Sequence, residues 1–205
     1  MLAAMACWAG VAVAHAAEKP VVVVAFGDSL TAGYGVSGAA SFPVRLSAAL
    51  AARGIGVRMV NAGVSGDTTA GGRARLDWML ADDPDLVIVE LGANDGLRGL
   101  EPAETFANLD AIVVRLKAEG VAVLLAGMLA PPNLGAEYGD AFNAVYRRLA
   151  DKHNIVFYRF FLDGVAAQPQ LNQPDGMHPN AAGVDVIVAG ILPYVVEALG
   201  NAGAR

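Results

Sequence analysis

The stretch VVVVAFGDSL, residues 21–30, combines an apolar run of strand length with a polar end. The continuous run over residues 21–26 is typical of a parallel strand that is buried on both faces. Gly27 permits a tight turn after that strand, and Asp28 and Ser29 stand where a helix would begin. The stretch therefore predicts the start of a βαβ unit, with polar groups at the carboxyl end of a buried strand.

The same alternation continues along the rest of the chain. Strand-length apolar runs alternate with segments whose apolar residues recur at helical spacing, which indicates a parallel sheet covered on both faces. The fold class is therefore α/β, a sandwich on a five-stranded parallel sheet. We predict strands over residues 21–26, 57–61, 86–91, 121–128 and 155–158. We predict helices over residues 42–53, 69–81, 102–119, 141–153 and 181–199, with 131–140 as the least regular segment.

Composition indicates one globular domain. The chain has 205 residues, of which 55% are hydrophobic and 17% charged, enough to bury a sizeable core. The formal net charge of -6 gives no reason to expect nucleic acid as a partner. We expect a monomer without a stable membrane anchor.

The first residues resemble a cleavable export signal. Residues 1–16 carry no Lys, Arg, Asp or Glu, and they end in AHA just before the first charges, Glu18 and Lys19. An apolar run that ends in small residues two apart is typical of a signal peptide, although a positively charged start is lacking. A buried first helix is the alternative. We therefore predict a periplasmic or secreted protein whose folded domain comprises residues 17–205.

Cys7 is the only cysteine and lies inside the predicted signal, so the exported chain would have no thiol. Disulfides, thiolate metal sites and cysteine nucleophiles are then excluded. A lipid anchor on Cys7 is a weaker alternative, because few residues precede it. No closely spaced cluster of His, Cys and carboxylates appears beyond Asp175 and His178, so we expect no metal.

Four polar motifs stand out against this apolar background. They are GDSL at residues 27–30, GVSGD at 63–67, GAND at 92–95 and DGMHPN at 175–180. The first three follow the first three predicted strands, and the fourth precedes the last helix. Ligands of open parallel sheets bind beyond the carboxyl ends of the strands, so these motifs hold the candidate functional residues.

Ser29 is placed as a nucleophile would be. Backbone N–H groups at the start of a helix stabilise negative charge, including that of an oxyanion formed by attack from Ser29. Two other interpretations of GDSL stay open when the motif is taken alone. Ser29 could cap the helix, or the loop could cradle a phosphate as in a flavodoxin-like domain.

A nucleophilic serine needs a base, and the chain has three histidines. His15 belongs to the predicted signal, and His153 ends a helical pattern, where we expect a solvated residue that suits the helix dipole. His178 follows Asp175 by three residues, with Gly176 between them to allow a sharp bend. One turn can thus carry an imidazole base and the carboxylate that orients it, although the motif by itself is also an ordinary turn and helix cap.

Acyl transfer also needs donors for the developing oxyanion. The backbone N–H groups of Ser29 and Gly66 and the side-chain amide of Asn94 are the candidates. Loss of one such donor typically costs about 2.7–4 kcal/mol of transition-state stabilisation. Taken singly, Gly66 is also a turn glycine, and Asn94 a helix cap or turn residue.

Together the four motifs resemble the four sequence blocks of the SGNH (GDSL) hydrolases, in order and over about residues 21–199. The longer stretches GDSLTAGY at 27–34, VSGDT at 64–68 and ELGANDGLRG at 90–99 are most similar to the branch of bacterial periplasmic thioesterase I, arylesterase and lysophospholipase L1.

The resemblance implies a flavodoxin-like three-layer α/β/α sandwich and a carboxylic ester hydrolase that needs no cofactor. It implies Ser29 as nucleophile, Gly66 and Asn94 in the oxyanion hole, and Asp175 and His178 as the other catalytic residues. Aryl esters, acyl thioesters and lysophospholipids are the implied substrates.

An acyl chain of such a substrate would lie along a shallow apolar groove. The candidate walls are Leu30, Leu97, Leu100, Leu129 and Pro131, although isolated leucines of this kind are normal on any domain.

Two rival functions remain open. The same triad could remove acetyl groups from carbohydrates, which would require a polar cleft lined by aromatic residues, and few aromatics lie near the motifs. Alternatively, the chain could be a flavodoxin-like module that binds phosphate or sugar, for which Asp175 and His178 would be unnecessary.

Overall fold

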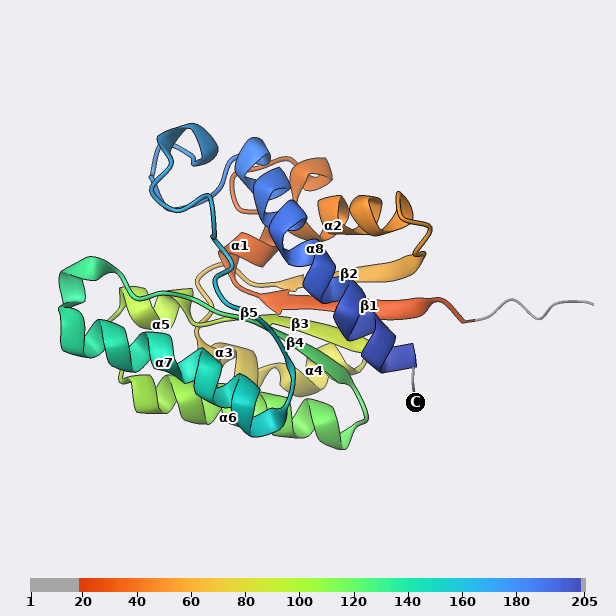
Figure 1. Ribbon diagram of the computed structural model, residues 1–205, viewed down its shortest axis with the longest axis horizontal. Coiled ribbons are helices and arrows are strands. Elements are labelled where there is room, and N and C mark those ends of the chain that lie inside the picture. Colours follow the sequence, from red (N-terminus) through yellow and green to blue (C-terminus); the bar gives the residue numbers. More distant parts are fainter. Residues whose placement is uncertain (1–18, 204–205) are drawn as a thin grey trace, which may run out of the picture.

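The computed structural model describes residues 19–203, so the predicted signal, residues 1–16, lies outside the described residues. Five parallel strands form one sheet in the order β2-β1-β3-β4-β5, which confirms the predicted sheet (Figure 1). The strands are β1 Val21–Gly27, β2 Val57–Gly63, β3 Leu86–Glu90, β4 Ala122–Ala126 and β5 Val156–Tyr158.

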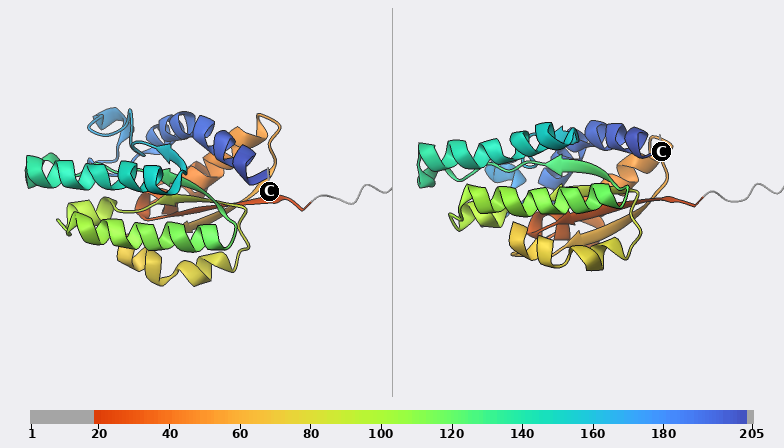
Figure 2. Two further views of the ribbon diagram at one scale, coloured as in Figure 1. Left: turned by 60° about the horizontal axis from the view of Figure 1, so that its bottom comes forward. Right: turned by 90° about the horizontal axis from the view of Figure 1, so that it is seen from below.

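Helices cover both faces of the sheet and complete a three-layer sandwich. Helices α2 and α8 pack on one face, and α3, α6 and α7 lie on the other (Figures 1 and 2). The helices are α1 Ser29–Ala32, α2 Phe42–Ala51, α3 Thr69–Ala74, α4 Leu76–Leu80, α5 Ala93–Leu97, α6 Pro102–Ala118, α7 Ala136–His153 and α8 Ala181–Gly203.

Two of the predicted helices were wrong in detail. The single helix predicted over residues 69–81 is broken at Arg75, which ends α3 and begins α4 with φ -104° and ψ 12°. Helix α7 begins at Ala136 and not at residue 141, so much of the segment predicted to be irregular is helical. Tyr138 in this first part of α7 stacks on Phe142 one turn later, with ring centroids 5.9 Å apart.

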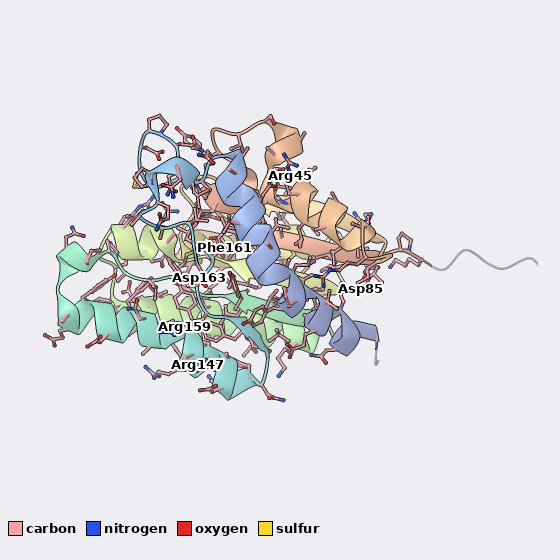
Figure 3. The ribbon with its side chains drawn as sticks, turned by 45° about the horizontal axis from the view of Figure 1, so that its top comes forward. Arg45, Asp85, Arg147, Arg159, Phe161 and Asp163 are labelled. Atoms are coloured by element: carbon pink, nitrogen blue, oxygen red, sulfur yellow. The ribbon has the colours of Figure 1, made fainter. Side chains whose placement is uncertain are left out.

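The core lies on both faces of the three central strands, β1, β3 and β4, which are almost wholly buried. Helix α8 is long and apolar enough to cross a membrane, with mean hydropathy 1.8, but one of its faces is buried against the sheet. Phe161, which is labelled in Figure 3, belongs to the buried core and meets Phe42 of α2 edge to face at 5.0 Å. Helix α8 therefore packs as a core helix in this structure.

The strand order places a topological switch point between β1 and β3. The chain leaves β1 toward β2 on one side and leaves β3 toward β4 on the other. Ligand sites of such sheets lie where the connections diverge in this way. Ser29 follows β1 and Asn94 follows β3, so the two residues flank this point.

Candidate active site

Ser29, His178 and Asp175 form one chain of hydrogen bonds. His178 Nε2 lies 3.0 Å from Ser29 Oγ, and His178 Nδ1 lies 2.7 Å from Asp175 Oδ2. The imidazole is 19% exposed and the carboxylate 34%. This arrangement allows the imidazole to take the proton of Ser29 while Asp175 fixes its tautomer.

The turn that carries Asp175 also fixes its charge. Asp175 Oδ1 accepts the backbone N–H of His178 at 3.0 Å and that of Met177 at 2.9 Å. These bonds, with the bond from the His178 ring, lower the pKa of Asp175 to about 2. Gly176 makes the bend possible with φ +71°. Asp175 is therefore a carboxylate at any pH near neutrality.

Ser29 is the first residue of α1, and it is Asp28 that caps the helix. Asp28 Oδ1 accepts the backbone N–H of Leu30 at 3.0 Å. At Gly27, a Cβ atom would lie 2.2 Å from Thr31 Oγ1 and 2.4 Å from Glu90 Oε2, far closer than van der Waals contact allows, so only glycine fits. Because Asp28 supplies the cap, the Ser29 side chain is free to face His178.

The three predicted oxyanion donors lie at neighbouring strand ends. Gly66 has φ +82° in a turn that Asp67 N closes on Val64 O at 3.0 Å. In the described part of the chain, the N–H groups of Ser29 and Gly66 have no hydrogen-bond acceptor. The Asn94 amide donates to Asp28 Oδ2 at 3.0 Å and to Asp67 O at 2.9 Å, so both neighbouring motifs orient it.

Two buried carboxyl groups lie behind this site, and sequence analysis did not assign them a role. Glu90 is fully buried; its Oε2 accepts the Thr31 hydroxyl at 2.7 Å, and its Oε1 has no partner. Burial raises the pKa of Glu90 well above its usual range and that of Asp28 to about 6. The signal for Glu90 was a single charge in the otherwise apolar run over residues 86–91.

Tyr34 covers one face of the His178 imidazole. The sequence did not predict this contact. The Tyr34 ring centroid lies 4.6 Å from that of His178, with the planes inclined by 40°. Gln173 Nε2 donates to Tyr34 O at 2.7 Å and to Pro179 O at 2.9 Å. The Gln173 amide thus ties the loop after α1 to the loop that carries His178.

The predicted groove residues differ in exposure. Leu97 and Leu129 are exposed, at 54% and 44%, and Leu100 and Pro131 are half-buried. Leu30 is only 9% exposed and belongs to the hydrophobic core, so little of it is left to contact a ligand.

His153 is not the solvated residue that we predicted. It does end α7, but its side chain is only 10% exposed, and its Nε2 lies 2.7 Å from Asp110 Oδ1 on α6. The packing of α7 on α6 buries the ring, which the helical pattern alone could not show.

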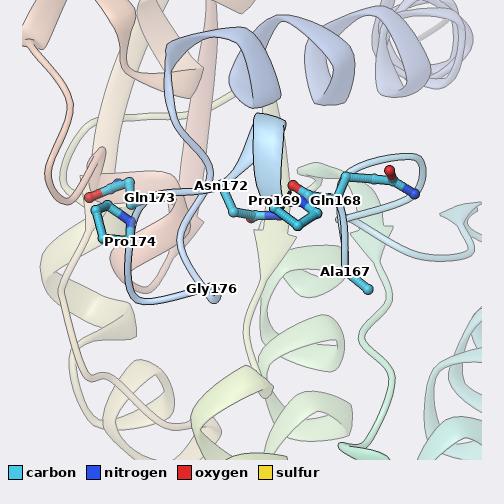
Figure 4. Close-up of a pocket in the computed structure, with 7 residues that line it drawn as sticks. All are labelled: Ala167, Gln168, Pro169, Asn172, Gln173, Pro174 and Gly176. Carbon is cyan, nitrogen blue, oxygen red and sulfur yellow. Dashed lines mark hydrogen bonds between the residues drawn. The ribbon is translucent and has the colours of Figure 1, made fainter.

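A cavity of about 430 Å³ lies beside the loop that carries Asp175 and His178, but Ser29 is not in its lining (Figure 4). The lining residues of the cavity are Ala167, Gln168, Pro169, Asn172, Gln173, Pro174 and Gly176.

Within residues 19–203, no group of three or more His, Cys, Asp or Glu residues is placed to hold a metal ion.

Known proteins are similar to this chain in sequence and in fold. The chain is 41% identical over 180 residues to esterase TesA of Pseudomonas aeruginosa, covering 87% of this chain and 89% of that protein. It is also 41% identical over 155 residues to thioesterase 1/protease 1/lysophospholipase L1 of Escherichia coli, covering 75% and 73%. A crystal structure of TesA matches with a TM-score of 0.83 and 39% identity, over 86% of this chain and 99% of that one.

Residues 25–186 match the model of the GDSL-like Lipase/Acylhydrolase family. All four polar motifs fall within this span. The chain therefore belongs to the GDSL-like lipase/acylhydrolase family of serine ester hydrolases.

Proposed function

We propose that the chain cleaves carboxylic esters and thioesters through an acyl-enzyme on Ser29, with His178 as general base and Asp175 as its partner. The observation that carries this proposal is the chain of hydrogen bonds through the three side chains, at 3.0 Å and 2.7 Å. A phosphate- or sugar-binding module would have no use for that chain of contacts.

In the first half of the reaction, Ser29 Oγ attacks the carbonyl carbon and His178 takes its proton. The negative carbonyl oxygen is stabilised by the N–H groups of Ser29 and Gly66 and by the Asn94 amide. The tetrahedral intermediate then expels the alcohol or thiol, to which His178 returns the proton.

In the second half, His178 takes a proton from water, which attacks the acyl group on Ser29. The bond from the acyl carbon to Ser29 Oγ then breaks, His178 returns the proton to Oγ, and the acid leaves. Asp175 stays ionised throughout and stabilises the imidazolium that forms in each half.

We propose acyl thioesters, lysophospholipids and aryl esters as substrates. Exposed Leu97 and Leu129 would contact an acyl chain, and the E. coli relative is a thioesterase and lysophospholipase by name. Thiolates and phenolates are better leaving groups than alkoxides, so acyl thioesters and aryl esters demand less proton delivery by His178 than lysophospholipids, whose leaving group is an alkoxide.

We expect residues 96–101 to close over a bound acyl chain, because Gly96 and Gly99 give this segment conformational freedom. Limited proteolysis with and without an acyl ligand tests this. Protection of the segment by ligand is expected, and identical cleavage would contradict closure.

The test of the reaction is hydrolysis of p-nitrophenyl esters from acetyl to palmitoyl, by the wild type and by Ser29→Ala. The variant should lose several orders of magnitude in kcat. Activity on medium and long chains that Ser29→Ala abolishes would support lipid esters. Acetyl-only activity would favour a carbohydrate O-acetyl esterase, and activity that is indifferent to Ser29 would refute the mechanism.

We further propose that residues 1–16 are a cleavable export signal and that the enzyme works as a monomer in the periplasm or outside the cell. The apolar run and its small-residue end support export. An exported enzyme would not normally meet acyl-CoA, which favours lipid or foreign esters as natural substrates. N-terminal sequencing of the exported protein would reveal a start near Ala17, whereas an intact Met1 would refute cleavage.

A further inference from the structure

Arg75 stands at the break between α3 and α4, and each of its guanidinium nitrogens has an acceptor. Nε donates to Asp67 Oδ2 at 2.6 Å, Nη1 to Ala62 O at 2.8 Å and Nη2 to Gly27 O at 2.9 Å. The guanidinium also lies over the ring of Phe26, 4.3 Å from its centroid. At the residue where the helix is interrupted, the side chain therefore faces the strand ends.

The three acceptors belong to the segments that carry the oxyanion donors. Gly27 ends β1 two residues before Ser29, and Ala62 is the penultimate residue of β2. Asp67 directly follows Gly66. One side chain therefore fixes the ends of two strands relative to the turn that presents the Gly66 N–H.

The contact continues through Asp67 to the third donor. The Asp67 carboxylate is held by Arg75, while its backbone carbonyl accepts the Asn94 amide at 2.9 Å. The Arg75 and Asp67 side chains are only 17% and 11% exposed, so water competes weakly for their ion pair. Motion of Asp67 would displace the Gly66 N–H and the Asn94 amide together.

We propose that Arg75 and Asp67 are positioning residues of the oxyanion hole, an inference that rests on the proposed function. Neither side chain contacts Ser29, His178 or Asp175 through a hydrogen bond in the described structure. Their effect is on transition-state binding, because the donors they place act on the charged oxygen of the tetrahedral intermediate.

Lysine cannot replace Arg75 in this role. Its ammonium is a single point, whereas the guanidinium donates in three directions from one plane. In Arg75→Lys, the ammonium can reach Asp67 or the strand carbonyls but cannot hold both in their present geometry. Because misplacement of a catalytic group by about 1 Å can cost about 10²-fold, we expect kcat to fall about 10- to 100-fold.

The test compares Arg75→Lys and Asp67→Asn with the wild type on a p-nitrophenyl ester of medium chain length. We expect kcat to fall in both variants while KM stays within about twofold, because substrate in the ground state has no oxyanion. An alkylboronic acid, which forms a tetrahedral anion on the serine, should bind more weakly in proportion to the loss in kcat/KM. Asp67→Asn should show the same pattern with a smaller loss, since the amide keeps the shape of the carboxylate.

The matched control is Arg147→Lys on the outer side of α7 (Figure 3). Arg147 also pairs with an aspartate, Asp151 at 3.8 Å, and lies over a phenylalanine ring, Phe157 at 4.9 Å, but it contacts no part of the site. Its replacement should leave kcat and boronate affinity unchanged.

The proposal is overturned if folded Arg75→Lys and Asp67→Asn keep the kcat and boronate affinity of the wild type. It is also overturned if kcat falls only in step with the folded fraction, measured by thermal unfolding, while boronate affinity is unchanged. A different result would refute the proposed function itself: retention of wild-type activity by Ser29→Ala. Loss of activity in Ser29→Ala with full activity in Arg75→Lys would refute only the positioning role.

Discussion

The Asn94 amide donates one hydrogen to the carboxylate of Asp28, the residue before Ser29, at 3.0 Å. The other hydrogen goes to the carbonyl of Asp67. Asn94 is therefore oriented from both sides before any substrate binds, and an oxyanion at Ser29 must share or displace one of these acceptors. Beyond that exchange, a donor that is oriented in advance needs little reorganisation as charge develops.

Replacement of Asp28 by Asn should disturb that orientation. The Asp28 carboxylate accepts hydrogen bonds at both oxygens, from Leu30 N and from Asn94 Nδ2. Asn at this position has only one oxygen, so its own NH2 group must face one of the two donors. We expect kcat to fall about 10-fold or more in Asp28→Asn with KM little changed, measured by steady-state ester hydrolysis. Asp163→Asn, at an exposed position, is the control and should behave as the wild type.

The raised pKa of Asp28 also leads us to predict an unusual dependence of stability on pH. Burial raises its pKa from 3.8 to about 6, so between these values the folded state binds the proton more tightly than the unfolded state. This contribution makes the free energy of unfolding rise as pH falls from about 6 to about 4, and it is lost as pH rises through 6. One proton changes that free energy by up to about 1.4 kcal/mol per pH unit.

Urea unfolding of the wild type and Asp28→Asn at several values between pH 4 and pH 7 measures this effect. The difference in unfolding free energy between the two proteins should move in favour of the wild type as pH falls. A difference that stays constant over this range would show that Asp28 does not titrate with a raised pKa.

The sequence predicted those elements whose pattern of apolar residues is visible within one short segment. Strands β1 and β3 are recognised by their long apolar runs. Helix α6 is recognised by its helical spacing. Helices α1 and α5 are too short to show a period. The hydrogen bonds of Arg75 at the break between α3 and α4 reach strand ends up to 48 positions away, and no local pattern contains such tertiary contacts.

The same distinction holds for the site. Ser29, Asn94 and His178 stand in short motifs with a recognisable order, so they could be proposed from the sequence. The contact of Glu90 with Thr31 spans 59 positions, and Tyr34 packs on the ring of His178, which lies much farther along the chain. Supporting residues of this kind are visible only once the strands are placed side by side.

Asp175→Asn should leave the site folded but nearly inactive. The amide can keep the backbone contacts of Asp175 Oδ1, but it can present its NH2 group to His178 Nδ1 and so favour the wrong tautomer. In a comparable triad this change lowers kcat by about 10⁴-fold. Steady-state kinetics measure the loss, and unchanged thermal unfolding would show that the fold survives. A variant with more than about a tenth of wild-type kcat would contradict the role of Asp175.

Tyr34 should contribute through its ring and not through its hydroxyl. The ring centroid of Tyr34 lies 4.6 Å from that of His178. The residue as a whole is 54% exposed to solvent. Tyr34→Phe keeps the covered face of the imidazole and should retain kcat within about twofold. Tyr34→Ala uncovers that face and frees the ring to move, so kcat should fall several-fold with little change in stability. Equal kinetics in the two variants would show that ring packing does not hold His178.

Gly92 should be irreplaceable because of its backbone conformation and its neighbour. It precedes α5 with φ +115°, and a Cβ atom there would lie 2.1 Å from the Tyr146 hydroxyl oxygen. That buried hydroxyl donates to Leu91 O at 3.0 Å. We expect Gly92→Ala to lower the free energy of unfolding by about 2–5 kcal/mol, since strain and overpacking act together. It should also lower kcat, because Asn94 is two residues away.

A double-mutant cycle separates the two causes. Tyr146→Phe alone should cost about 1–2 kcal/mol, because it leaves Leu91 O without its donor. In the double variant the clash with the hydroxyl is gone, while the positive φ of residue 92 remains. The double variant should therefore be more stable than the sum of the single changes predicts, by about 1 kcal/mol or more. Additive losses, measured by urea unfolding, would mean that backbone strain alone requires glycine at this position.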